Sequence, residues 1–172
     1  MEAVSLARHA VLLLGATALA AGCADDGDPP PRRDATGCPV AVDYVAELLE
    51  YEVDVVEDGA SELACRYEPV DAGERPGSHV LIVERSIVDD GGYEAVRSGI
   101  EAEASTVETL DAEAIAELGE GAERGWLAEV GRAVQVGVST GDALFQITVA
   151  DAERSAEDAR EVALVLAAEA IR

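Results

Sequence analysis

Histidine, cysteine and carboxylate side chains are the groups in this chain of 172 residues that could perform chemistry. The chain has two histidines, and one of them, His9, lies in an N-terminal stretch that we assign below to an export signal. A Ser-His-Asp or Cys-His arrangement would therefore have to use His79. No serine lies in the strand-to-helix context of a nucleophile elbow. We interpret His79 as a polar residue at the start of a strand, and we expect no catalytic residue and no enzyme.

The 36 acidic residues do not by themselves single out a site. Asp25–Asp28 and Val88–Glu94 have the carboxylate density of a calcium loop, but neither follows the EF-hand pattern. A zinc site would need more free Cys or His side chains than the chain has. No pair of acids stands out as the pair that glycoside hydrolysis would need. We therefore predict no metal site and no cofactor.

The formal charge of the chain is −24, and all 12 of its basic residues are arginines. A surface of this sign repels nucleic acid and anionic lipid head groups. We interpret most of the acidity as a well-solvated exterior, and we exclude nucleic acid as a partner.

The N-terminal residues have the composition of an export signal. Arg8 precedes the twelve uncharged residues 10–21, which are too few to span a bilayer but suit the apolar region of a signal peptide. A buried N-terminal helix and an ordinary secretory signal cut near Ala21 are the two alternatives. We predict a signal peptide over residues 1–22.

The end of this stretch, Leu19-Ala20-Ala21-Gly22-Cys23, resembles the lipobox of bacterial lipoproteins. Two small residues precede the cysteine as in that motif, although Ala20 takes the place of its leucine. The resemblance implies that Cys23 is acylated and becomes the first residue, anchored to the membrane. Residues 23–37 are rich in Asp, Pro and Gly, which favours a disordered tether.

With Cys23 assigned to the lipid, Cys38 and Cys65 remain as an even pair in an exported domain. Such a pair is more typical of a disulfide than of a metal site or a nucleophile. In chain-entropy terms the bridge would stabilise the fold by about 3–4 kcal/mol.

The remaining sequence predicts one domain over residues 38–172. Apolar residues at helical spacing predict a helix after Cys38, another introduced by the "DDGG" segment and a last one after Ser155. Residues 52–69 and 78–88 predict three strands, and 132–151 predicts a hairpin about residues 139–142. Between 105 and 125 we predict only a helical turn or two.

Three apolar sets define the expected packing. Leu63, Cys65 and Tyr67 share one face of the second strand, so that Cys65 points toward the first helix. The middle helix has Tyr93, Val96 and Ile100 on one side, and the last helix packs through Val162, Val165, Leu166 and Ile171. The expected order is helix, three strands, helix, two strands, helix. This is an α+β fold with about five mainly antiparallel strands and helices on one face.

From the early cysteine, the "ACRYEP" segment and the Gly119-x-Gly121 turn, the chain resembles small exported lipoproteins of actinobacteria that carry a domain of unknown function. A weaker similarity is to extracellular sensor domains of actinobacterial membrane kinases. Neither resemblance implies a reaction or a set of catalytic residues.

Trp126 and the glycine turn before it, Gly119 and Gly121, are the possible binding surface. The glycines follow a helix rather than a strand, which favours a turn over a phosphate loop. Trp126 is either an exposed binding aromatic or the largest anchor of the core, and the shortage of other large side chains favours the core.

The resulting functional hypothesis is a lipid-anchored binding or accessory module at the outer face of the cell membrane. Its partner would be an envelope protein or a small ligand. The alternative is a carrier or sensor that holds a small apolar ligand between sheet and helices.

Overall fold

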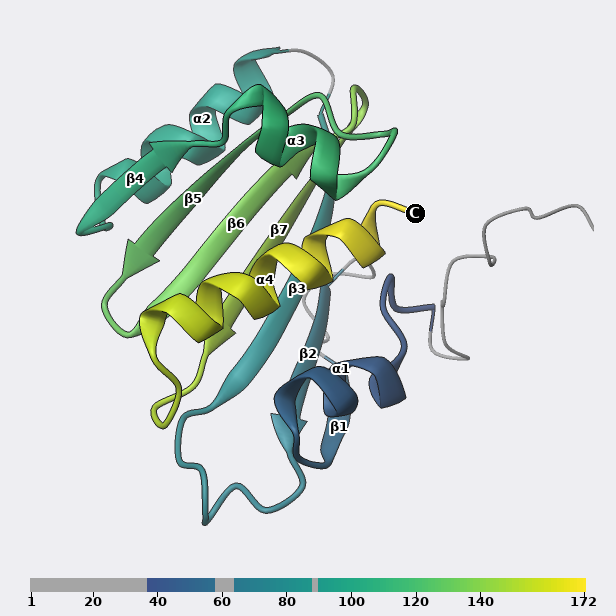
Figure 1. Cartoon of the computed structure of the whole chain (residues 1–172), viewed down its shortest axis with the longest axis vertical. Coiled ribbons are helices and arrows are strands. Elements are labelled where there is room, and N and C mark those ends of the chain that lie inside the picture. Colours follow the sequence, from purple (N-terminus) through teal and green to yellow (C-terminus); the bar gives the residue numbers. More distant parts are fainter. Residues whose placement is uncertain (1–36, 58–63, 88–89) are drawn as a thin grey trace, which may run out of the picture.

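The computed structural model describes residues 37–57, 64–87 and 90–172. Seven strands form one antiparallel sheet with the order β1-β2-β3-β7-β6-β5-β4 (Figure 1). The strands are β1 (Val53–Glu57), β2 (Ala64–Pro69), β3 (His79–Ser86), β4 (Thr106–Thr109), β5 (Arg124–Val130), β6 (Ala133–Ser139) and β7 (Ala143–Ala150). The helices are α1 (Val42–Leu49), α2 (Asp90–Glu101), α3 (Ala112–Leu118) and α4 (Ala156–Ala170).

The predicted signal peptide and all of the predicted tether except Gly37 lie outside the described residues. None of the helices in the described ranges combines the length and the apolar character that spanning a bilayer requires.

The hairpin of β6 and β7 occupies the middle of the sheet and confirms the prediction for this segment. Alternation places Val134, Val136 and Val138 on one buried face, and Val136 pairs with Ile147 of β7. Between the strands, Gly141 has φ of 88°, a backbone conformation that glycine adopts without a steric cost.

Helix α4 covers this hairpin, with α1 and α3 on either side of it on the same face of the sheet (Figure 1). Ser155 begins α4 as expected, because its Oγ accepts a hydrogen bond from the Asp158 N–H at 3.1 Å. Val162 and Leu166 are buried against the sheet, as predicted. Val165 and Ile171, which were also expected in the core, are only half-buried. They lie on the outer side of α4, because its last turns are apolar around most of their circumference.

Helix α2 packs on the opposite face of the sheet. Its Tyr93, Val96 and Ile100 pack with Trp126 and Ala128 of β5 in a second, smaller core. Leu127, between these two β5 residues, belongs to the larger core under α4. The expectation that helices cover only one face is therefore wrong. The apolar stripe of a helix shows that the helix needs a surface to cover, but not which face of a sheet provides it.

The sheet has two more strands than the five expected, and the missed strands are β4 and β5. Strand β5 is buried on both faces over residues 125–128, so its sequence lacks the polar and apolar alternation that marks a half-buried strand. Strand β4 has four residues, three of them exposed, and lacks an apolar pattern. The "DAEAIAELG" segment, where a helical turn or two was expected, is helix α3, capped by Asp111.

The Trp126 ring crosses the neighbouring strand at Gly137, its cross-strand partner. A Cβ added to Gly137 would lie among the atoms of the indole ring, and Trp126 itself has no exposed surface. Glycine at this position therefore allows the one tryptophan of the chain to lie flat on the sheet beneath α2.

We predict that Gly137→Ala lowers the free energy of unfolding by about 1–3 kcal/mol, because the ring and the strand must move apart. Gly99→Ala is the matched control. Its added Cβ meets no atom within 4 Å, and Ala in an exposed helix position should raise stability by about 0.5–1 kcal/mol. Urea unfolding followed by Trp126 fluorescence measures both. Equal stability of Gly137→Ala and the parent would contradict the packing described.

Candidate functional site

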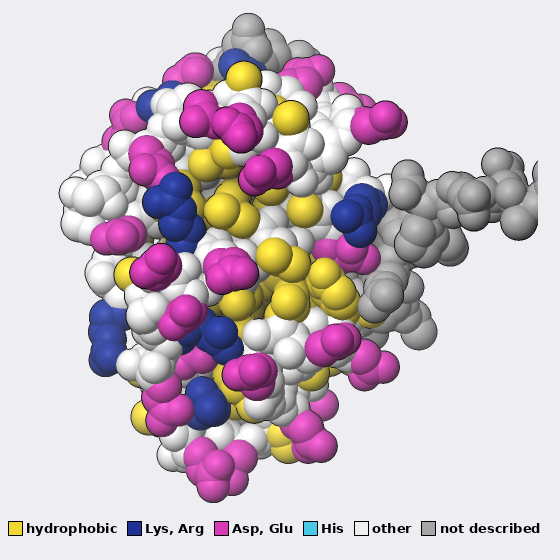
Figure 2. Space-filling view, in the orientation of Figure 1, with side chains coloured by type: hydrophobic (Ala, Val, Ile, Leu, Met, Phe, Trp, Pro, Cys, Tyr) yellow, Lys and Arg dark blue, Asp and Glu magenta, His cyan; other side chains and the backbone are white. Residues whose placement is uncertain are grey.

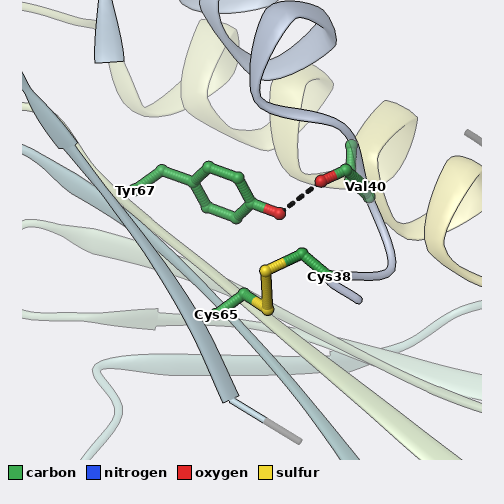
Figure 3. Close-up of a disulfide and its surroundings, with 4 residues drawn as sticks. All are labelled: Cys38, Val40, Cys65 and Tyr67. Carbon is green, nitrogen blue, oxygen red and sulfur yellow. Dashed lines mark hydrogen bonds between the residues drawn. A yellow bond between two sulfur atoms is a disulfide. The ribbon is translucent and has the colours of Figure 1, made fainter. Parts of the chain in front are cut away.

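The predicted disulfide is present between Cys38 and Cys65 (Figure 3). It joins the segment before α1 to strand β2 across a Cα–Cα distance of 5.8 Å, and both cysteines are buried. Cys65 and Tyr67 share the inward face of β2 as expected, whereas Leu63 lies outside the described residues. Cys23, the predicted lipidation site, also lies outside them.

A buried tyrosine reinforces this attachment. The Tyr67 hydroxyl donates a hydrogen bond of 2.5 Å to the carbonyl oxygen of Val40, two residues after Cys38 (Figure 3). Val40 and Tyr67 are both fully buried. The entrance to α1 is therefore held by one covalent bond and one hydrogen bond to the same strand.

The residues expected to form a binding surface are separated by the fold. Trp126 has 0% exposure, so its indole is the core anchor that composition favoured and offers no ring to a ligand. Gly119 and Gly121 lie in the loop between α3 and β5, where Gly121 is exposed. An added Cβ there would approach the carbonyl oxygen of Ile171 at 3.9 Å. This loop is thus adjacent to the end of α4, and the Trp126 ring lies on the other side of the sheet.

His79 begins β3 as expected and is half-buried. Its Nδ1 lies 3.1 Å from the carbonyl oxygen of Gly77, a local contact within the turn before the strand. The described residues contain no group of three or more His, Cys, Asp or Glu placed to hold a metal ion. Of the two acidic segments considered for calcium, residues 25–28 and 88–89 are outside the described part of the chain.

A connected polar cluster surrounds Asp151, directly after β7. Its carboxylate is 1% exposed, with Arg75 Nη1 at 3.7 Å and Arg154 Nε at 3.6 Å from Oδ2. Oδ1 accepts hydrogen bonds from Ser78 Oγ at 3.4 Å and from the Glu153 N–H at 3.0 Å. We call Tyr51, Arg75, Ser78, Asp151 and Arg154 the Asp151 junction.

The Asp151 junction also holds the C-terminal end of α1. Arg154 donates a hydrogen bond of 2.9 Å to the carbonyl oxygen of Leu49, the last residue of the helix. This helix has no basic residue in its last turn, so the guanidinium supplies the positive charge that a helix C-terminus favours. The Arg75 guanidinium lies 4.3 Å from the ring centroid of Tyr51 and pairs with Glu153 at 3.0 Å.

Burial and the nearby Asp151 carboxylate raise the pKa of Tyr51 from its ordinary value of 10.0 to about 12, although Arg75 and Arg154 oppose the shift. The phenol is therefore protonated at neutral pH and acts as a donor rather than a base. Burial likewise raises the pKa of Tyr93, against the opposing charges of Arg97 and Arg124.

A groove of about 310 Å³ lies beside the Asp151 junction. Its lining is Leu49, Glu50, Arg75, Asp151, Glu153, Arg154 and Asp158. These side chains can hold a small polar molecule. The contacts of Arg154 and Arg75 join the end of α1, the segment before β3 and the segment after β7, so the junction is a joint between three segments. Its residues gave no signal in the sequence because Tyr51, Arg75 and Asp151 meet only in the folded chain.

We predict that reducing the disulfide, or replacing both cysteines by serine, lowers the free energy of unfolding by about 3–4 kcal/mol. The bond closes a separation of 27 residues, and the unfolded chain regains that freedom when it is broken. Chemical unfolding with and without reductant measures the difference, and the double serine variant must show no further response to reductant. A stability that reductant leaves unchanged in the parent would contradict the structural role.

We predict that stability falls as the pH rises from about 10 to 12. In this range Tyr51 ionises in the unfolded chain but stays protonated in the folded one. Loss of the proton lowers the free energy of the unfolded state, so the free energy of unfolding falls. Tyr51→Phe should make the loss of stability between about pH 10 and 12 smaller. The loss that remains comes from Tyr93, whose pKa is also raised. Urea unfolding at a series of pH values tests it, and an unchanged slope in Tyr51→Phe would count against the raised pKa.

No protein-family model, curated protein or solved structure matches the chain. A functional proposal has to come from the residues of the chain and from the geometry of its fold.

Proposed function

We propose that the chain is an exported lipoprotein that acts as a non-catalytic binding or accessory module at the outer face of the cell membrane. The Cys38–Cys65 disulfide carries this proposal, because structural disulfides are stable in oxidising compartments outside the cytosol. The signal-like residues 1–22 and the lipobox-like Cys23 agree with such a destination.

The position of the bridge also fits an anchor followed by a tether. It fixes Cys38 near the beginning of the described residues, and residues 24–37 lie between Cys23 and Cys38 in the sequence. Fourteen residues reach about 45–50 Å when fully extended. A domain held in this way can meet a partner at the membrane surface while its acidic exterior keeps it away from anionic lipid head groups.

The packing under α4 favours a binding surface over an internal ligand. Val136, Ile147 and Leu166 fill the space between sheet and helix and have no exposed surface. The groove beside the Asp151 junction is lined mainly by charged side chains, which does not suit an apolar ligand. These observations favour the binding module over the alternative of a carrier or sensor that holds a small apolar ligand between sheet and helices.

Mass spectrometry of protein extracted from membranes tests the proposal. We expect a chain that begins at Cys23, with the added mass of a diacylglyceryl group, and that gains two hydrogen atoms on reduction. A Cys23→Ser variant should lose the lipid and leave the membrane fraction while keeping the disulfide. A chain cut elsewhere, without lipid and with free thiols at Cys38 and Cys65, would contradict it.

A further inference from the structure

The outer side of the second half of α4 is apolar. From Val162 to Ile171 the helix contains one charged residue, Glu169, and this residue is buried and paired with Arg172 at 3.1 Å. The side chains that face outward over this span are half-buried, namely Leu164, Val165, Ala168 and Ile171. Leu164, Ala168 and Ile171 pack against the larger core with part of their surface and leave the rest uncovered, whereas the outer side of a helix that only covers a core is polar.

The neighbouring helices widen this surface. Half-buried Ile115 of α3 and Val42 of α1 pack against the same core as Leu164 and Ile171. Figure 1 places α3 and α1 on either side of the second half of α4, and Figure 2, in the same view, shows hydrophobic side chains gathered in the middle of this face. We call Val42, Ile115, Leu164, Val165, Ala168 and Ile171 the apolar strip. An apolar area of this kind inside a polar rim is typical of a protein interaction site.

The rim of the apolar strip is acidic. Each of its three helices carries two exposed acids spaced by one helical turn: Asp43 and Glu47 on α1, Glu113 and Glu117 on α3, and Glu157 and Glu161 on α4. The arginines in α4 and directly after it form ion pairs: Arg160 pairs with Glu108, and Arg172 pairs with Glu169. Figure 2 shows acidic side chains, together with several arginines, around the hydrophobic ones on this face.

We infer that the apolar strip is a docking site for an amphipathic helix of a partner protein, with an apolar stripe flanked by Lys or Arg. The stripe would pack on α4, and the basic flanks would meet the acids of the rim. A second copy of the chain fits less well, because each chain has a formal net charge of −24 and the acids of its own rim would face those of the first copy. The inference deepens the proposed binding function but needs neither the lipid nor the export.

Titration with a synthetic peptide tests the inference directly. The probe is an amphipathic helix of leucine and lysine, about 14 residues or four turns long, and its control has glutamate at every lysine position. The protein is the full chain carrying Cys23→Ser, with the disulfide formed, so that no lipid contributes. We expect the lysine peptide to bind and the glutamate peptide not to bind. Failure of the lysine peptide to bind overturns the inference.

Two matched pairs of variants then separate the apolar strip from general attraction to an acidic protein. Leu164→Gln should weaken binding at least about tenfold. Val70→Gln removes a valine that is 55% exposed away from the strip, and it should leave peptide affinity unchanged.

The second pair changes charge. Glu161→Gln should weaken peptide binding and reduce the dependence of binding on salt, whereas Glu103→Gln, the same charge change next to α2, should do neither. If both members of a pair weaken binding equally, the attraction is non-specific and the inference is wrong.

Sedimentation velocity tests whether a second copy of the chain, rather than a partner helix, occupies the apolar strip. A monomer that binds one peptide supports the inference. A dimer of the chain alone that Leu164→Gln dissociates would assign the apolar strip to a second copy and overturn it. Mass spectrometry of the anchor is independent of both results, so failure of the docking site and failure of the lipoprotein proposal are distinguishable.

Discussion

The packing of α4 on β6 and β7 is the interaction on which the rest of the structure depends. These three elements are consecutive in the chain, and their contact buries aliphatic side chains such as Val136, Ile147 and Leu166 completely. Strands β1 to β3 extend the sheet on one side of this layer, and β5 and β4 extend it on the other. The chain has few aromatic residues, so the core gains its stability from many small dispersion contacts that require close packing.

Helix α1 shows how a short element is kept in place at the margin of this layer. Eight residues are too few for a stable isolated helix, and its N-terminus has no side-chain cap. The disulfide and the Tyr67–Val40 hydrogen bond hold its entrance, while Arg154 holds its exit at Leu49. Covalent and polar contacts thus hold both ends of this short helix.

The surface combines two features with different consequences. A formal charge of −24 favours solvation of the surface and opposes self-association. On the outer side of α4 this exterior is interrupted by half-buried apolar residues. An apolar surface surrounded by acids favours a basic partner over an acidic one.

The sequence by itself determined the elements whose signals are local: the β6–β7 hairpin, the start of α4 at Ser155 and the pairing of Cys38 with Cys65. It did not reveal β5, because a strand buried on both faces loses the alternation by which strands are recognised. Only the tertiary structure decided that α2 covers the second face, that Val165 and Ile171 face outward, and that Tyr51, Arg75 and Asp151 meet. The physical reason is the same in each case. The spacing of apolar residues along a segment indicates which side chains can be buried. Contacts between segments far apart in the chain decide what buries them.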